Sequence, residues 1–301
     1  MAGQNMHEHD HGHDKKRSLR WAIGLTALVC LAEIGGGLLS GSLSLLGDAA
    51  HMLQDTVALF LSLGAIIIAE QLPTPTRTFG YHRVEIGAAV ANGLLLIMVS
   101  VLIITQALER FAQPRAIEST VMLGVAVIGL MANIAAACML HGSHDLNVKS
   151  AFLHVIGDTL SSIAVIVAAV WIALTGQTLI DPVLGILIAG VIIISSFSIM
   201  REAFAILLQF APRGIDISEI IRDMESVEGV GSVHNIHFWT LCPNINILDA
   251  HVYSCETNAR HIETMRAEIK RRLEKYLIGH STLEFECERC GDCRVVQELR
   301  D

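Results

Sequence analysis

The chain has 301 residues, of which 52% are hydrophobic and only 17% are charged, and its mean hydropathy is +0.52. A soluble globular domain carries about a quarter charged residues, so this composition predicts a membrane protein with several spans. Acidic residues outnumber basic ones and the formal charge is -9, which argues against binding to nucleic acid because phosphate contacts need a basic surface.

Residues 1–18 alternate histidine with acidic or small residues and contain no apolar segment that could join a core. We predict that they form a disordered, His-rich cytoplasmic tail. Such a tail either gathers metal loosely or is only a solvated terminus, and both interpretations stay open. No small-residue cleavage site follows this stretch, so we expect the first apolar helix to stay in place as an anchor.

Six apolar stretches follow, and each reaches the ~20 residues that cross a bilayer. We predict helices over residues 19–40, 43–70, 86–108, 120–140, 148–175 and 182–208. Most Lys and Arg residues in the connecting loops fall on one side, and only Arg110 and Arg115 fall on the other. The positive-inside rule then places both termini in the cytoplasm. We expect an all-α, lipid-embedded domain over residues 19–210, in a plasma membrane of the bacterial inner-membrane type.

Two of these helices carry ionisable pairs where a bilayer-spanning helix normally carries none. His51 and Asp55 stand four residues apart in the second helix, and His154 and Asp158 repeat that spacing in the fifth. Residues at i and i+4 share one helix face. Ionisable groups at membrane depth cost on the order of 3 kcal/mol each on insertion scales, so they typically mark an ion or substrate pathway. One pair is often only a satisfied buried network, but its repetition favours a functional site.

Two imidazoles and two carboxylates form a ligand set that suits tetrahedral Zn²⁺ and also accepts Co²⁺ or Cd²⁺. Sulfur ligands are missing from this set, which argues against Cu(I). Metal ions and protons compete for the same atoms, because a metal-bound His must be neutral and a metal-bound Asp ionised. We therefore expect exchange of metal for protons. The chain has no G-x-x-x-x-G-K-[ST] loop, so an ion gradient must supply the energy.

Two alternatives come from other functional classes. An intramembrane metalloenzyme would need an H-E-x-x-H motif on a membrane helix and an open ligand position, and the six predicted membrane helices lack the motif. A membrane-anchored zinc sensor would have little use for ligands at bilayer depth. We therefore expect a transporter rather than an enzyme.

After residue 208 the sequence alternates apolar with charged and polar residues. For residues 211–301 this pattern predicts a small α+β domain in the order helix, strand, strand, helix, strand. Alternation along the first strand places His234, Ile236 and Phe238 on one face and His237 on the other. A domain of this size commonly needs dimerisation or metal for stability. The odd cysteine count and a C-x-x-C-x-x-C run suit reduced thiols, in agreement with a cytoplasmic tail.

Over nearly its whole length the chain resembles the cation diffusion facilitator family, in its zinc-transporting branch. The resemblance rests on SGSLSLLGDAAHMLQD, TFGYHRVEIGAA, LNVKSAFLHVIGDTLSS and, in the tail, VHNIHFWTL, DAHVYS and GHSTLEFE. It implies a homodimer that exchanges cytoplasmic zinc for external protons, and a tail of metallochaperone-like, ferredoxin-like fold. It also implies that the transported zinc is bound by His51, Asp55, His154 and Asp158.

The resemblance further implies a second, regulatory metal cluster in the tail. The matching positions are His234, His251, His280 and Glu286. Whether Glu284 joins this cluster stays open. The same holds for the thiols of Cys287, Cys290 and Cys293, which are either additional ligands or an incidental reduced terminus.

Overall fold

The computed structural model describes residues 24, 26–69, 74–140, 146–243, 245–287 and 295. Within these ranges, the side chains of residues 55, 58–59, 62–63, 65–69, 136–137, 139–140 and 146–155 lie outside the description. The chain divides into two compact units, Met1–Gln71 with Ala88–Met200, and Leu72–Gly87 with Arg201–Asp301. The second unit therefore joins the tail to a segment that is distant in the sequence.

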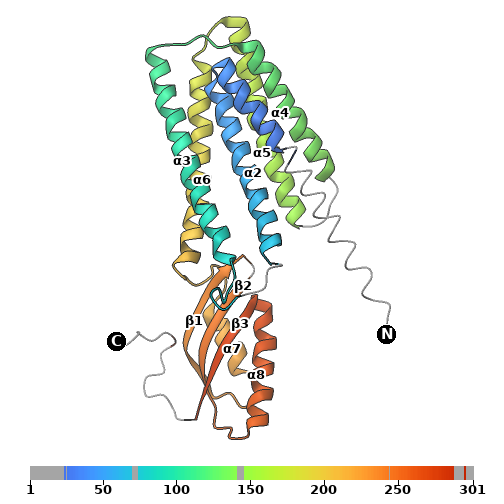
Figure 1. The fold of residues 1–301 in the computed structure, drawn as a ribbon, viewed down its shortest axis with the longest axis vertical. Coiled ribbons are helices and arrows are strands. Elements are labelled where there is room, and N and C mark those ends of the chain that lie inside the picture. Colours follow the sequence, from blue (N-terminus) through green and yellow to red (C-terminus); the bar gives the residue numbers. More distant parts are fainter. Residues whose placement is uncertain are drawn as a thin grey trace, which may run out of the picture. The chain divides into compact units, whose positions relative to one another are not determined.

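Long apolar helices build the first unit (Figure 1). They are a helix over Thr26–Ser40, α2 (Leu43–Ala69), α3 (His82–Ala112), α4 (Ser119–Leu140), α5 (Leu146–Thr175) and α6 (Ile180–Leu207). Among the described residues, three stretches are long and apolar enough to cross a membrane, namely His82–Ala112, Ile156–Thr175 and Ile180–Leu207. The chain thus contains a helical membrane domain.

The observed helices lie close to their predicted ranges, but α3 begins at His82 rather than at residue 86. The prediction followed the apolar run, which starts later than the helix does. The residues before this run contain no helix breaker, and Glu85 lies in the first turn, where a carboxylate interacts favourably with the helix dipole. Hydropathy therefore located the membrane-crossing part of α3 and missed its polar first turn.

Small residues let these helices approach closely. Leu45 of α2 and Met122 of α4 pack with Val165, Ala168 and Ala169 of α5 in one buried cluster. Gly36 of the first helix faces α4 so closely that a Cβ at this position would lie 2.5 Å from Val125 Cγ2. Gly36 therefore has a packing role, because any side chain at this position would push the two helices apart.

A buried carboxylate at the start of α6 ties α6 to the start of α2. Asp181 is 0% exposed, and Arg110 Nη1 of α3 lies 3.2 Å from its Oδ2. Its oxygens also accept hydrogen bonds from Ser42 Oγ (2.6 Å), Leu43 N (2.7 Å), Ser44 Oγ (2.6 Å) and Ser44 N (3.1 Å). Asp181 thus satisfies backbone donors of the first turn of α2 that have no partner within the helix.

The tail contains α7 (Ile217–Glu225), β1 (Ser232–Cys242), β2 (Ile245–Tyr253), α8 (Ala259–Leu273), a 3-10 turn (Glu274–Tyr276) and β3 (Ile278–Glu286). This order of helices and strands agrees with the prediction. The sheet has the order β1-β2-β3, with β1 antiparallel and β3 parallel to β2. Both helices lie on one face of the sheet (Figure 1), where Ile220, Met224, Met265 and Ile269 form a core with the apolar side of the strands. Among the described residues, no helix covers the opposite face of the sheet.

Strand β1 contains a bulge. The pairing register with β2 shifts between His234 and His237, and Asn235 has a φ of 48°. The irregularity shifts the alternation by one residue, so that both Val233 and Ile236 enter the core while His234 points away from it. The prediction that His234 shares a face with Ile236 and Phe238 is therefore wrong. His234 lies on the helix-free face, in register with His251 of β2.

Candidate metal centres

The first candidate centre joins α2 to α5. His51 Nε2 lies 3.1 Å from Asp158 Oδ1, although the two residues are far apart in the sequence. The two side chains are 21% and 10% exposed, so the contact is largely buried. Each residue comes from one of the two H-x-x-x-D motifs, and the packing of α2 against α5 brings the motifs together.

Asp55 and His154 complete the predicted ligand set, but their side chains lie outside the description. Asp55 stands one turn after His51 on α2, and His154 stands one turn before Asp158 on α5. The two helices run in opposite directions (Figure 1). The backbone at Asp55 is therefore level with that at His154 when His51 is level with Asp158. The structure thus brings together one member of each pair, and the set of four ligands stays a prediction.

The second candidate centre lies on the helix-free face of the tail sheet. Glu286 of β3 bridges two histidines: its Oε2 is 3.1 Å from His234 Nε2, and its Oε1 is 2.5 Å from His251 Nδ1. The two imidazole rings are tilted, with centroids 5.5 Å apart. One ligand atom of each residue lies within 4.8 Å of the others, as a shared metal ion requires.

Two neighbours extend this centre. Glu284 Oε2 lies 3.6 Å from His251 Nε2, and the amide Nδ2 of Asn235 is 3.1 Å from the same nitrogen. His234 is only 2% exposed, and its Nδ1 has no hydrogen-bond partner among the described residues. Two imidazoles with one or two carboxylates are a donor set that suits Zn²⁺, and each imidazole gives one nitrogen to it. The residues present therefore fit a metal ion.

His280 is not brought into this cluster. It pairs with Ile247 near the start of β3, whereas His251 pairs with Glu284 near its end. Glu286 lies six residues after His280 along the strand, a distance of about 20 Å. His280 instead contacts the ring of Phe79 edge-on, at a centroid distance of 5.9 Å. Cys287 follows directly after Glu286 and is exposed, while Cys290 and Cys293 lie outside the described residues.

Comparison with known proteins is consistent with these features. Residues 19–208 match the profile of the cation efflux transmembrane domain, and residues 212–286 match that of the cation efflux protein cytoplasmic domain. The chain belongs to the cation diffusion facilitator family. Proteins of this cation efflux family are transporters rather than enzymes.

Three bacterial relatives match over nearly their whole length. The "Cadmium, cobalt and zinc/H(+)-K(+) antiporter" of Bacillus subtilis is 37% identical over 287 residues, which are 94% of this chain and 92% of the relative. The "Metal cation efflux system protein CzcD" of Cupriavidus metallidurans is 38% identical over 296 residues, with 97% and 93% covered. The "Zinc transporter ZitB" of Escherichia coli is 37% identical over 300 residues, with 96% and 95% covered.

A histidine and a cysteine of this cation diffusion facilitator meet elsewhere in the second unit. His82 Nδ1, at the start of α3, lies 3.6 Å from Cys242 Sγ at the end of β1. Burial raises the pKa of the Cys242 thiol, and the charge of Glu85 raises it further. A protonated thiol is a poor metal ligand. This pair is therefore a weaker candidate than the cluster around Glu286.

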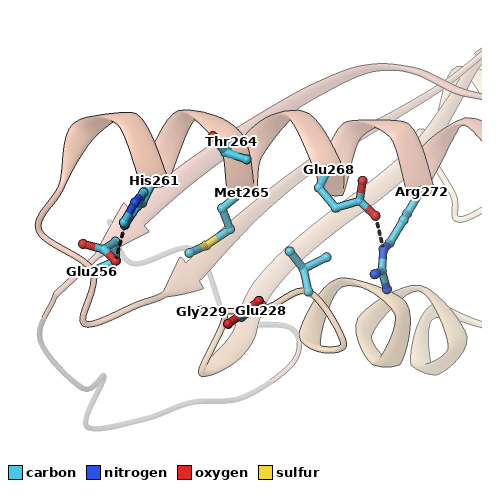
Figure 2. A pocket seen from close by; sticks show the side chains of 9 residues that line it. Glu228, Gly229, Glu256, His261, Thr264, Met265, Glu268 and Arg272 are labelled. Atoms are coloured by element: carbon cyan, nitrogen blue, oxygen red, sulfur yellow. Dashed lines mark hydrogen bonds and ion pairs between the residues drawn. The ribbon is translucent and has the colours of Figure 1, made fainter.

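A surface pocket of about 620 Å³ lies beside α8 in the same unit (Figure 2). Its charged groups are already paired, because His261 Nδ1 lies 3.0 Å from Glu256 Oε2 and Arg272 Nε donates to Glu268 Oε1 at 2.9 Å. A hydrogen bond from the backbone N–H of Asn258 and one from His261 lower the pKa of Glu256, which is half-buried. Among the described residues, those that line this pocket do not form a group of three potential metal ligands.

Sequence reasoning missed one contributor to these centres. The motif and alternation arguments gave no role to Asn235, whose positive φ creates the bulge that turns His234 toward His251. The signal available was weak, since Asn merely tolerates this conformation better than most residues.

Proposed function

We propose that this chain is a secondary active transporter that exports Zn²⁺, and also Cd²⁺ and Co²⁺, from the cytoplasm in exchange for protons. The single observation that carries the proposal is the contact of His51 with Asp158, because it unites the two ligand motifs inside the helical unit. The names of the relatives support the choice of ions, since they include zinc, cadmium, cobalt and protons.

The geometry also suggests how protons and metal exclude each other. His51 and Asp158 lie within hydrogen-bonding distance, so a proton on His51 Nε2 is stabilised by the carboxylate. Zinc binding requires the same nitrogen to be neutral and the same carboxylate to be ionised. Zinc must therefore displace the proton, and a proton arriving from the other side promotes release of zinc. We infer that this competition couples the two fluxes.

Zinc flux in proteoliposomes with an imposed pH gradient tests this proposal. His51→Ala and Asp158→Ala should each lose the pH-driven zinc flux while the purified proteins keep their helix content. His261→Ala, which removes an exposed imidazole from the tail, is the matched control and should transport like the unmodified chain. Undiminished flux in both site variants would defeat the proposal.

We infer a regulatory metal ion at His234, His251 and Glu286, with Glu284 as a further candidate ligand. The short distances and the unpartnered nitrogen of His234 support this site. A bound ion would link all three strands of the tail sheet and stabilise the folded tail, because it binds the folded form alone. His280, which the resemblance placed in this cluster, lies too far along β3 to share the ion directly.

The remaining organisation is proposed on the same basis. We propose a membrane domain of six spans over residues 19–210 and a cytoplasmic domain over 211–301, with both termini in the cytoplasm of a bacterial-type inner membrane. The order of the tail elements supports a ferredoxin-like, metallochaperone-like fold. The match to the cation efflux cytoplasmic domain supports association of two copies. Light scattering of the full chain in detergent would test this homodimer.

A further inference from the structure

A second pair of buried carboxylates lies in the first unit, outside the proposed ligand set. Glu33, on the helix over Thr26–Ser40, is 1% exposed, and Asp48, on α2, is 3% exposed. Ionisable groups inside an apolar helix bundle are costly, and they typically carry an ion or a proton. The proposed function so far assigns no task to either residue.

Asp48 lies one helical turn from the candidate metal centre. It precedes His51 by three residues on α2, about 4.5 Å along the helix axis. Its partners on α5 follow Asp158 by a similar step: Ser161 Oγ donates to Asp48 Oδ1 at 2.6 Å, and Ser162 Oγ donates to Oδ2 at 3.2 Å. Both oxygens of Asp48 therefore accept hydrogen bonds, as the oxygens of an ionised carboxylate do, and this carboxylate lies beside the centre.

Glu33 reaches the same layer from the first helix. A Cβ built on Gly129 of α4 would collide with Glu33 Oε1 and would lie 4.0 Å from Ser162 Oγ. The absence of a side chain at Gly129 thus makes room for the Glu33 carboxyl group, close to the hydroxyl that bonds Asp48. The second oxygen, Oε2, is buried and has no hydrogen-bond partner among the described residues.

The surroundings of Glu33 disfavour a negative charge. Glu33 interacts electrostatically with Asp48 on α2 and with Asp158 on α5, and both are acidic. His51 is the basic group that interacts with Asp48, while α4 contributes Asn133, which does not ionise. An ionised carboxylate with a bare oxygen in a medium of low polarity loses its hydration and is repelled by its neighbours. A proton on Glu33 removes both penalties.

We propose that Glu33 is a proton-carrying residue, separate from the metal ligands, that holds a proton in the metal-free protein and releases it when a divalent ion binds near His51 and Asp158. The inference rests on the proposed function, in which the proton is the counter-substrate. A nearby dication offsets the repulsion from the carboxylates and favours ionised Glu33. Ser162, whose hydroxyl donates to Asp48 Oδ2 and lies near the Glu33 carboxyl group, connects Glu33 to Asp48 for transfer of the proton.

A proton fits this place better than a metal ion does. Both oxygens of Asp48 are already occupied by serine hydroxyls, and one oxygen of Glu33 is open. Zinc prefers four ligands, whereas a proton needs one basic oxygen and one acceptor. The Glu33–Asp48 pair supplies the latter set.

Calorimetric titration of zinc into the purified full chain, in buffers of different ionisation enthalpy, counts the protons released per ion. Glu33→Gln keeps the shape of the side chain but cannot ionise, so zinc should still bind while about one proton fewer is released. Glu109→Gln, an exposed position on α3, is the matched control and should release as many protons as the unmodified chain. Equal proton counts for Glu33→Gln and the unmodified chain would overturn the proposal.

Infrared difference spectroscopy without metal gives a second, independent answer. The unmodified protein should show the band of a buried protonated carboxyl group, and Glu33→Gln should lack it. If Glu33→Gln fails to fold, Glu33→Asp should shift this band, and an unshifted band, or no band in the unmodified protein, contradicts the proposal. Undiminished zinc flux in the His51→Ala and Asp158→Ala variants would contradict the proposed transport function, not the role of Glu33. The spectra recorded without metal test the role of Glu33 in either case.

Discussion

Replacing Asp181 by alanine should destabilise the helical unit strongly. The carboxylate is completely buried, and the change leaves Arg110 with its charge buried and without its acid. Removing one partner of a buried ion pair costs about 3–5 kcal/mol. The hydroxyl groups of Ser42 and Ser44 lie 3.2 Å apart and can still bond each other. The loss of their hydrogen bonds to Asp181 therefore adds little to this cost. For a unit of this size the cost corresponds to a fall in melting temperature of about 6–20 °C.

Thermal unfolding of the purified full chain in detergent measures this effect. Asp216→Ala is the matched control, because Asp216 caps α7 at an exposed site and its loss should cost only about 1 kcal/mol. The double variant Asp181→Ala with Arg110→Met removes the stranded charge and should recover at least half of the loss. A fall no larger than that of Asp216→Ala, or a double variant no more stable than Asp181→Ala, would refute the reasoning.

Three further outcomes follow from the tail. Asn235→Val should destabilise the chain by about 1–2 kcal/mol in thermal unfolding and weaken zinc binding by the tail, because a β-branched residue resists the positive φ. Asn235→Gly should keep the bulge. Equal stability of the two variants would contradict this prediction. Glu286→Gln should lower the zinc affinity of the tail at least tenfold in competition titrations, since both histidines lose their shared carboxylate, whereas the exposed Glu263→Gln should have no effect. Hydrogen bonds from Arg271 and Arg272 lower the pKa of Glu268 from 4.5 to about 2, so the stabilisation by ionised Glu268 is present above pH 4.5 and is lost as the pH falls toward 2. Glu268→Gln should therefore reduce the dependence of the unfolding free energy on pH between 4.5 and 2. An unchanged dependence would exclude this contribution.

The helices and the order of the tail elements were predictable because they depend on local signals. Apolar runs located α2 to α6 to within a few residues, and the change to mixed sequence near residue 208 separated the tail. The folding of residues 72–87 with the tail was not predictable, since it depends on contacts such as that of Phe79 with His280. Pairing between distant segments leaves no periodic trace in the chain.

For the candidate centres, the outcome depended on how regular the backbone is. The repetition of the i,i+4 pair on two helices predicted that His51 and Asp158 belong to one centre, and a continuous helix keeps each pair on one face. Alternation along β1 failed at Asn235, where an extra residue changes the phase of every position before it. The resemblance selected His234 correctly as a neighbour of His251, but it carried no information on how far His280 lies along β3.

The shared second unit has a practical consequence for dissecting the protein. The chain passes between the two units after Gln71, after Gly87 and after Met200. A truncation before residue 211 would therefore remove the partners of Phe79 and His82, which remain attached to the helices. Such a fragment would leave the ring of Phe79 and the imidazole of His82 without the contacts that they make in the full chain. A loss of activity in the fragment would therefore report on this segment as well as on the missing domain.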